Sequence, residues 1–295
     1  MRIAFASGKG GTGKTFVSTN VFNILLERGI KTNIVDCDAE VPNVCIFFDA
    51  KEKNKWPVNE YRPEIDIDKC VFCGKCVEYC NYHALFYIPS SKILKVMEDT
   101  CHGCSACRYA CEYGAITDSY KKVGEVTHFE YSELGNIFEG RMRIHSMATV
   151  IVLKDAIKHS KNTDCEISLF DAPPGTSCPF IQTSLRADFV IFVAEPTPFG
   201  ISDLRQSIET LKGMNIKCGV IINRSDLGND ALEKYLYSEN IPIIAKIPFS
   251  KEFAKYYTAG KIASQYSEEA HKTFDKITDF VINKNKELKA KETSK

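Results

Sequence analysis

A glycine-rich stretch near the start of the chain carries residues that suit phosphate chemistry. Gly8 to Thr15 fits the pattern G-x4-G-K-[ST], and the preceding run, Arg2–Ser7, is apolar enough to form a buried strand. In such a loop the backbone N–H groups curl around phosphates, and the following helix adds the partial positive charge of its first turn. We expect Lys14 to contact the β- and γ-phosphates and Thr15 to bind Mg²⁺. The predicted phosphate-binding set is Gly8, Gly10, Gly11, Thr12, Gly13, Lys14 and Thr15.

Cysteine is the second residue type whose spacing could do chemistry. The segments Cys70–Cys80 and Cys101–Cys111 both have the spacing C-x2-C-x2-C-x3-C. This spacing is typical of proteins with two [4Fe–4S] clusters, in which the fourth cysteine of each run ligates the other cluster. The first predicted ligand set is therefore Cys70, Cys73, Cys76 and Cys111, and the second is Cys101, Cys104, Cys107 and Cys80. Zinc is the alternative, but a zinc site needs four ligands and leaves the duplicated third cysteine unexplained.

The cysteine-rich segment contains an internal repeat. Eight residues recur, in identical or similar type, 31 positions later. The first copies are Asp68, Cys70, Cys73, Cys76, Cys80, Tyr82, Ala84 and Leu85, and the second copies are Asp99, Cys101, Cys104, Cys107, Cys111, Tyr113, Ala115 and Ile116. One constant offset is typical of a duplicated half-domain. We expect an inserted module at 61–120 and a second, discontinuous domain formed by 1–60 and 121–295.

Composition narrows the class of protein. Among 295 residues, 38 Lys and Arg balance 38 Asp and Glu, so the overall charge does not favour nucleic acid or an anionic membrane as a partner. Disulfide frameworks belong to short secreted chains, whereas this chain has 13 cysteines, no leader-like start and no apolar stretch of membrane-spanning length. We expect a cytoplasmic protein that uses its thiols as metal ligands.

Outside the cysteine-rich segment, apolar strand-like runs alternate with helical patterns. Strands are predicted at 2–7, 31–38, 166–171, 188–195, 217–223 and 242–247, and helices from the glycine loop to about 29, at 146–158 and 201–211, and after each of the last two strands. Such alternation favours an α/β fold with a mostly parallel, doubly wound sheet and helices on both faces. A small α+β module, spliced in at about 60–120, interrupts it.

The glycine loop resembles that of a known superfamily. Lys-Gly-Gly-Thr-Gly-Lys-Thr at 9–15 is similar to the deviant P-loop of MinD, ParA, the nitrogenase iron protein and Mrp-type carriers. The resemblance implies ATP or ADP with Mg²⁺ as ligands. It also implies a homodimer that forms with ATP, in which Lys9 reaches the nucleotide of the partner subunit.

The same resemblance assigns roles to three polar strand ends. Asp-Cys-Asp at 36–38 looks like the switch I strand end, which gives Asp38 the task of positioning the attacking water. Asp-Ala-Pro-Pro-Gly-Thr at 171–176 is similar to switch II, which places Asp171 near Mg²⁺ through water. Asn223 resembles the asparagine that reads adenine. Acids and asparagines at strand ends are commonly helix caps, and the functional interpretation depends on their order after the P-loop.

Two further strings resemble a narrower branch, the MinD-like ATPases with an inserted bacterial-ferredoxin-like domain. They are Asp-Ala-Glu-Val-Pro-Asn at 38–43 and Glu-Pro-Thr-Pro-Phe-Gly at 195–200, and this resemblance covers nearly the whole chain. One departure is that Asn81 and Glu112 stand where ferredoxins usually have proline. Neither position is a ligand, so the departure concerns local rigidity and potential.

The remaining cysteines and the C-terminal segment have ordinary interpretations. Cys178 lies seven residues after Asp171, where the nitrogenase iron protein has a ligand to its bridging cluster, but no second cysteine lies near position 143. We expect Cys178 to be non-ligating, with a bridging cluster as the alternative. The segment with Phe274, Ile277 and Val281 should pack on the sheet, the alternative being a membrane-surface helix.

Three functions are compatible with these features. The first is an ATP-hydrolysing redox protein that couples ATP to electron transfer through two [4Fe–4S] clusters, and full eight-cysteine coordination favours it. The second is an Mrp-type ATPase that assembles or carries an iron–sulfur or other metal cofactor. The third is a positioning ATPase of the MinD/ParA kind. The protein partner, either a redox protein or a cofactor-assembly protein, has no sequence signal.

Overall fold

A nine-stranded sheet forms the centre of the main body. The computed structural model describes residues 1–144, 146 and 148–293, with side chains described as far as residue 290. In sheet order the strands are β11 (Ile243–Ile247), β10 (Cys218–Asn223), β9 (Phe189–Ala194), β1 (Arg2–Ala6), β8 (Ile167–Asp171), β2 (Thr32–Asp36), β7 (Gly135–Met142), β6 (Ile116–Ser132) and β3 (Lys51–Ile65). The strands from β11 to β7 run parallel, and β6 and β3 are antiparallel to their neighbours.

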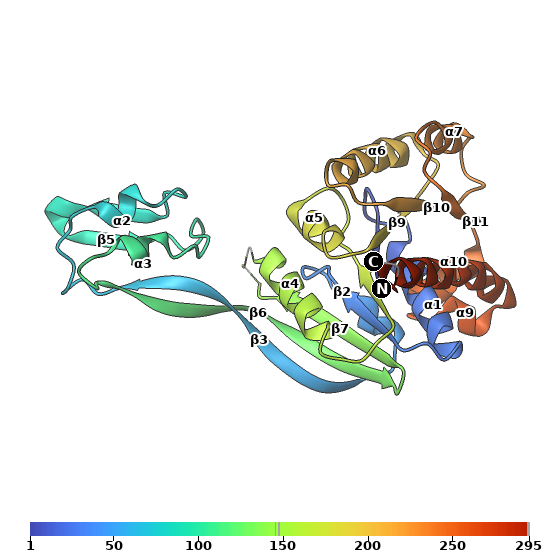
Figure 1. The fold of residues 1–295 in the computed structure, drawn as a ribbon, viewed down its shortest axis with the longest axis horizontal. Helices are drawn as coiled ribbons and strands as arrows, with labels where there is room; N and C mark the ends of the chain where they lie inside the picture. The colour runs from blue at the N-terminus through green and yellow to red at the C-terminus, as the bar shows by residue number, and fades with distance from the viewer. Residues whose placement is uncertain (145, 147, 294–295) are drawn as a thin grey trace.

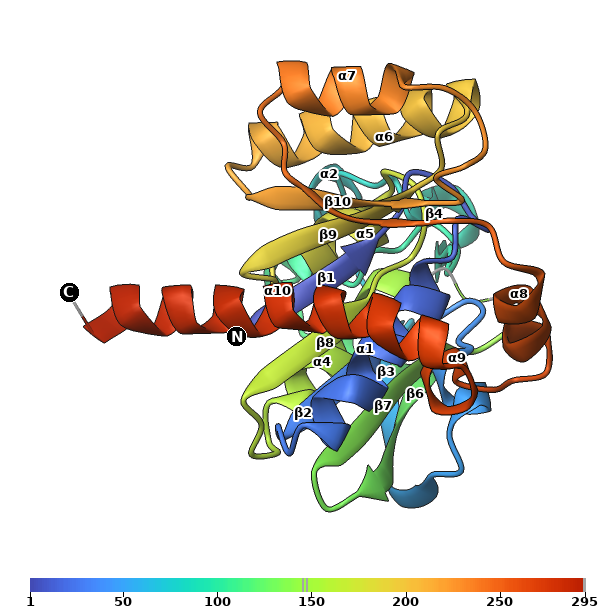
Figure 2. The same ribbon diagram turned by 90° about the vertical axis from the view of Figure 1, so that its right-hand side faces the viewer.

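Helices cover both faces of this sheet (Figures 1 and 2). One face carries α1 (Lys14–Glu27), α8 (Lys251–Thr258), α9 (Ala263–Tyr266) and α10 (Glu268–Thr293), and the other carries α4 (Thr149–Ser160), α5 (Cys178–Ser184), α6 (Pro198–Gly213) and α7 (Ala231–Ser238). The central strands β2, β8 and β9 are buried along their whole length, and β1 is buried from its second residue on, as expected for a sheet covered on both sides. The predicted mostly parallel α/β fold is therefore confirmed.

The C-terminal helix α10 belongs to the body. Phe274, Ile277 and Val281 are fully buried in the core that α10 shares with α1, which confirms the packing interpretation. Among the residues that the structure describes, no helix is long and apolar enough to cross a membrane.

Several element ends differ from those predicted. Strand β2 stops at Asp36 rather than at 38, because the Asp36 carboxylate accepts the backbone N–H of Asp38 and bends the chain there. Helix α4 begins at Thr149 rather than at 146, and residue 147 lies outside the described residues. Strand β7 was not predicted, since its Gly-Asn and Glu-Gly-Arg stretches hide the apolar pattern.

Strands β3 and β6 continue beyond the sheet as a two-stranded ribbon. The β6–β7 pairing ends at Gly124 opposite Met142, whereas the β3–β6 pairing continues to Ile65 opposite Ile116. We call residues 59–65 and 116–122 the ribbon. At about 3.3 Å per residue, the 15-residue strand β3 spans about 50 Å. The ribbon carries residues 66–115, which we call the lobe, away from the body (Figure 1).

The lobe repeats one structural unit. It contains α2 (Lys75–Glu78), β4 (Leu85–Ile88), the 3-10 turn η2 (Pro89–Ser91), β5 (Ile93–Val96) and α3 (Ala106–Ala110). Thirty-one residues separate the starts of α2 and α3, and also the starts of β4 and β6. The left-handed backbone positions repeat at the same offset: Phe72, Gly74 and His83 in the first half, and Gly103, Ser105 and Gly114 in the second. The sequence repeat is thus also a repeat of backbone conformation.

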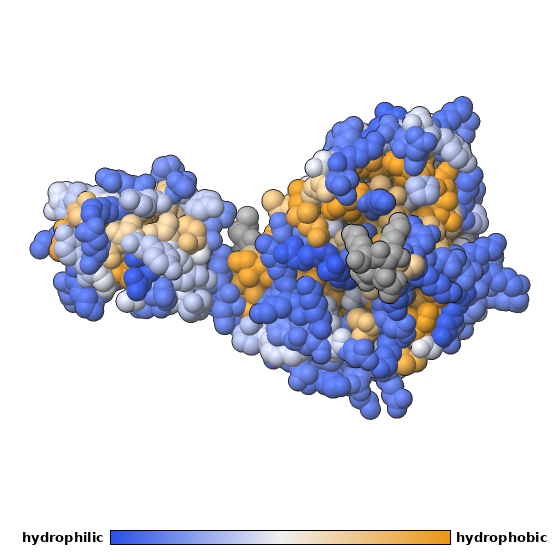
Figure 3. Space-filling model, in the orientation of Figure 1, coloured by the Kyte–Doolittle hydropathy of each residue, from blue (hydrophilic) through white to orange (hydrophobic). Residues whose placement is uncertain are grey.

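The ribbon leaves the body at a defined edge. Asp36, the last residue of β2, lies opposite Glu139 of β7, which lies opposite Thr127 of β6. Residues of β6 that precede Gly124 therefore extend past the end of β2. This is the carboxyl edge of the parallel strands, where open α/β sheets bind their ligands. In Figure 3 the lobe is largely hydrophilic, with a paler apolar band across the visible face.

Candidate functional sites: the nucleotide edge and the cysteine lobe

The glycine loop lies between β1 and α1 at this carboxyl edge, which we call the nucleotide edge. Gly11 and Gly13 have φ of +80° and +92°, which favours glycine at both positions. A Cβ on Gly13 would lie 2.5 Å from Nδ2 of Asn223, whereas Gly10 and Gly11 face open space. The Thr12 hydroxyl is buried and has no hydrogen-bond partner in the structure. An open glycine cradle with an unpaired buried hydroxyl fits a bound nucleotide.

Lys14 and Asp171 form a buried ion pair at the base of this loop. The Lys14 Nζ lies 2.8 Å from Asp171 Oδ2, and Thr15 donates its hydroxyl to the same oxygen at 2.7 Å. Ser18 donates to Asp171 Oδ1 at 2.9 Å. Burial alone would lower the pKa of Lys14, but the nearby carboxylates, Asp171 above all, together raise the net pKa. Lys14 therefore stays charged, and the predicted phosphate and Mg²⁺ residues stand in contact.

Asp36 and Asp38 have different surroundings. The Asp36 side chain is fully buried and accepts the backbone N–H groups of Asn43 at 2.7 Å and Val44 at 2.9 Å. Burial, and then repulsion from Asp171, raises the pKa of Asp36 to about 7. Asp38 is partly exposed, and burial is the main cause of its raised pKa. Asp36 thus holds the turn after β2, and the Asp38 carboxylate accepts the backbone N–H of Val41 at 3.3 Å.

Asn223 borders a pocket that suits the base of a nucleotide. Its Nδ2 donates to the backbone oxygen of Thr12 at 2.7 Å, which ties β10 to the glycine loop. The adjoining pocket has a volume of about 240 Å³. Its lining is Gly11, Gly13, Phe16, Asn223, Arg224, Pro248, Phe249, Ser250, Phe253, Ala254, Tyr257 and Thr258. The aromatic residues of α8 had not been predicted as site residues, because a 253/257 spacing on a helix also fits ordinary core packing.

Lys9 forms an ion pair within its own subunit in this structure. Its Nζ is 3.4 Å from Oε2 of Glu195, which follows strand β9. The role of Lys9 in a partner subunit stays a prediction.

In the lobe, the eight motif cysteines surround two separate hollows. The first hollow is lined by Cys70, Cys73, Cys76 and Cys111, together with Tyr87, Leu94 and Ile116. The second is lined by Cys101, Cys104, Cys107 and Cys80, together with Tyr61, Pro63 and Leu85. Each hollow thus takes three cysteines from one repeat and the fourth from the other. The two groups contain the same residues as the two predicted ligand sets, and the role of these cysteines as cluster ligands stays a prediction.

Thiols within each hollow influence one another. Burial, and then the nearby Cys70 and Cys73, raises the pKa of Cys76 to about 11. For Cys107, burial is again the main cause of a pKa of about 11, with Cys101 adding to it. Four thiolates in one such hollow would repel each other, so their joint ionisation requires a cationic group between them.

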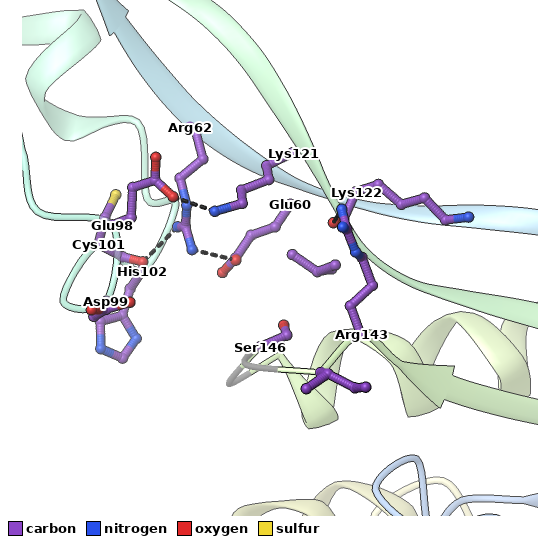
Figure 4. Close-up of a pocket in the computed structure, with 12 residues that line it drawn as sticks. Glu60, Arg62, Glu98, Asp99, Cys101, His102, Lys121, Lys122, Arg143 and Ser146 are labelled. Carbon is purple, nitrogen blue, oxygen red and sulfur yellow. Dashed lines mark hydrogen bonds and ion pairs between the residues drawn. The ribbon is translucent and has the colours of Figure 1, made fainter.

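The second hollow is tied to the ribbon by a charged contact (Figure 4). Arg62 donates to the backbone oxygen of Cys101 at 2.6 Å and to Glu60 at 2.6 Å, and both side chains are largely buried. Beside them Lys121 pairs with Glu98. These residues line a pocket of about 260 Å³ that reaches Arg143 at the end of β7. The first hollow has instead a hydrogen bond from Tyr87 to Phe72.

The other cysteines lie apart from these hollows. Cys37 is fully buried beside β2, and Cys178 is exposed at the first residue of α5. Among the described residues, no three His, Cys, Asp or Glu side chains converge closely enough to hold one metal ion.

Comparisons with known proteins agree with the fold. The chain is 28% identical to the uncharacterized protein MJ0579 of Methanocaldococcus jannaschii, over 96% of this chain and 98% of that protein. It is 21% identical to an iron–sulfur cluster carrier protein of Pyrococcus abyssi, over 99% and 88% of the two chains. The solved septum site-determining protein MinD of Pyrococcus horikoshii, with Mg-ADP, matches with a TM-score of 0.58, 19% identity and 95% coverage of both chains.

A family model covers most of the chain. The model described as CobQ/CobB/MinD/ParA nucleotide binding domain matches residues 3–263, a range that includes the P-loop, Asp171, Asn223 and the whole lobe. The chain therefore belongs to the CobQ/CobB/MinD/ParA family of nucleotide-binding P-loop ATPases.

Proposed function

We propose that this protein is an ATP-hydrolysing iron–sulfur protein that dimerises with ATP and couples ATP to electron transfer through two [4Fe–4S] clusters. Cys70, Cys73, Cys76 and Cys111 would hold one cluster, and Cys101, Cys104, Cys107 and Cys80 the other. The observation that carries the proposal is the crossed grouping of these cysteines around two hollows. Each bound cluster would supply a one-electron redox centre.

The chemistry of the hollows supports a cluster over a single ion. A [4Fe–4S] cube takes one thiolate at each of four separated corners, and its iron supplies the positive charge that four thiolates need. Zinc would draw its four ligands around one point. Two separate hollows, each lined by four cysteines, match the needs of two such cubes better than those of a single ion.

Residues at the nucleotide edge would divide the work of ATP hydrolysis. Lys14 would exchange Asp171 for the β- and γ-phosphates, because both are anionic partners of one ammonium group. Asp171 would then orient water on the Mg²⁺ that Thr15 binds. Asp38 would orient the attacking water, Asn223 would read the base, and Lys9 would act on the nucleotide of the partner subunit.

Backbone contacts connect this edge to the ribbon. The residue after Asp38, Ala39, accepts the backbone N–H of Met142 at 2.9 Å. Arg143, which follows Met142 in the sequence, donates its backbone N–H to the backbone oxygen of Val123 in β6 at 2.8 Å. A displacement of the turn after β2 would thus be passed through β7 to the base of the ribbon. This path supports coupling between nucleotide state and the lobe.

The second candidate function is a carrier or assembly ATPase of the Mrp type. The relative from Pyrococcus abyssi, a carrier of iron–sulfur clusters, is the observation in its favour. Carriers must release their cluster, so chelator at neutral pH should strip the iron readily under this alternative. Retention of iron through the same treatment favours permanent redox centres.

Anaerobic purification tests the proposal directly. We expect about eight iron and eight sulfide per chain, from two four-iron clusters. Cys80→Ser should damage the cluster held by Cys101, Cys104 and Cys107, which lies in the other repeat. Cys178→Ser is the matched control and should leave the iron content unchanged. About four iron with zinc in a matching amount, or damage confined to the cluster of the first repeat, would refute the assignment.

A further inference from the structure

Glu195 occupies the centre of a charged group that spans three neighbouring strands. In the sheet, β9 lies between β1 and β10. Lys9 follows β1 in the glycine loop, Glu195 follows β9, and Arg224 follows β10. Because the strands are parallel, all three side chains are delivered to the nucleotide edge, with the carboxylate in the middle.

Glu195 pairs with both cations at once. Its Oε2 lies 3.4 Å from Lys9 Nζ, and its Oε1 accepts a hydrogen bond from the Arg224 guanidinium. The Glu195 side chain is only 8% exposed, whereas Lys9 and Arg224 are 35% and 42% exposed. Removing the only cation beside a buried carboxylate costs free energy, because the buried charge is left unpaired. If a second cation remains paired with the carboxylate, this cost is smaller.

The backbone around Glu195 holds it in place. Its carbonyl accepts the N–H of Thr197 at 2.8 Å, and a Cβ on Gly200 would lie 2.6 Å from the same oxygen. Arg224, on the other side, lines the base pocket next to Asn223 and adopts a left-handed backbone with φ of +51°. Glu195 is thus a fixed acceptor between Arg224, which lines the base pocket, and Lys9.

We propose that Glu195 is the positioning residue for Lys9, and that Arg224 lowers the free-energy cost of releasing Lys9 from Glu195. Glu195 holds Lys9 against its own subunit before dimerisation. When Lys9 leaves for the nucleotide of a second copy, Arg224 keeps the buried carboxylate paired. This inference rests on the ATP-dependent dimer of the proposed function and adds residues to which the resemblance assigns no role.

Opposite effects on dimerisation follow for substitutions of Glu195 and of Arg224. Sedimentation with a saturating non-hydrolysable ATP analogue would measure the dimer dissociation constant. Glu195→Gln should tighten the dimer by about 5-fold or more, since typical couplings span about 5–150-fold. Arg224→Gln should weaken it, because the departing Lys9 would leave Glu195 unpaired. In the double variant the Arg224 effect should vanish.

Controls separate this effect from general changes in surface charge. Glu239→Gln removes an exposed ion pair with Lys212 elsewhere on the body and should leave the dimer unchanged. Glu195→Gln placed on Lys9→Ala should not restore the dimerisation that Lys9→Ala is expected to lose. Nucleotide affinity, measured in each variant at a protein concentration where monomers dominate, should be equal with and without Glu195→Gln.

A second measurement tests the contact in the monomer. Reductive methylation of lysines, followed by mass spectrometry, should proceed faster at Lys9 in Glu195→Gln than in the unaltered protein, with no change at Lys272. If the unaltered protein does not dimerise with the analogue, the proposed dimer fails, but this rate still tests Glu195. An unchanged Lys9 rate, or a Glu195→Gln dimer that is no tighter, would overturn the inference.

Discussion

The nucleotide edge and the lobe bring their functional residues together by different routes. Lys14 and Asp171 are 157 positions apart in the sequence, and the parallel sheet places them in contact. All eight cysteines of the lobe lie between Cys70 and Cys111, and one repeated turn conformation brings them together. The body therefore depends on long-range topology, and the lobe depends on local sequence.

The cores of the two regions differ correspondingly. The body has two large apolar clusters, one on each face of the sheet. The apolar cluster of the lobe has six buried residues of the lobe itself and Ile116 of the ribbon, and three of the six are the cysteines Cys76, Cys80 and Cys107. Small natural domains commonly add a metal or disulfides, because a single small core contributes little stability. We therefore expect the body to form its site before a nucleotide binds, whereas the lobe would need the proposed clusters to complete its fold.

Loss of iron should therefore affect the two regions unequally, and this is the largest expected effect. After anaerobic chelation, amide hydrogens of 66–115 should exchange about 100-fold faster or more, because metal-binding energy in small domains is folding energy. Amides of β1, β8 and α1 should keep their protection. Hydrogen exchange with mass spectrometry resolves both regions, and a lobe that stays protected without iron would contradict the comparison.

A substitution at the nucleotide edge should have the converse pattern. Lys14→Ala should weaken nucleotide binding by about 10- to 100-fold, since a charged hydrogen bond is worth about 1.5–3 kcal/mol. The iron content of the lobe should not change. Lys9→Ala is the matched control, because it should bind nucleotide normally in the monomer and lose ATP-dependent dimerisation. Isothermal titration measures the affinity, and equal losses in both variants would remove the distinction between them.

The smallest effect concerns the difference between the two hollows. Arg62→Gln should lower the potential of the cluster near Cys101, because a positive charge leaves and Glu60 remains. Glu60→Gln should raise it. A shift on the order of 60 mV is expected, since about 59 mV corresponds to about 1.4 kcal/mol for one electron. Lys75→Gln removes an exposed ion pair with Glu112 and is the control, because it should leave the potential of the cluster near Cys101 unchanged. Shifts of one sign in both Arg62→Gln and Glu60→Gln would contradict this account.

Much of this arrangement could be predicted from the sequence. The P-loop and the cysteine spacing are local patterns with a direct physical meaning, and the repeat predicted a module between two parts of an α/β fold. The ion pair of Lys9 with Glu195 could not be predicted, because it joins residues on different strands. The long ribbon was also missed: β3 and β6 are rich in Lys, Glu and Tyr, and their exposed faces lack an apolar pattern.

The central claim is that nucleotide state and cluster potential influence each other through the ribbon. Redox titration with EPR on Asp38→Ala, a variant expected to bind ATP without hydrolysing it, would compare the nucleotide-free and ATP-bound forms. Since such influences are reciprocal and typically worth about 1–3 kcal/mol, at least one cluster should shift by about 40–130 mV. Potentials that agree within about 15 mV, well below that range, would mean that the lobe does not sense ATP.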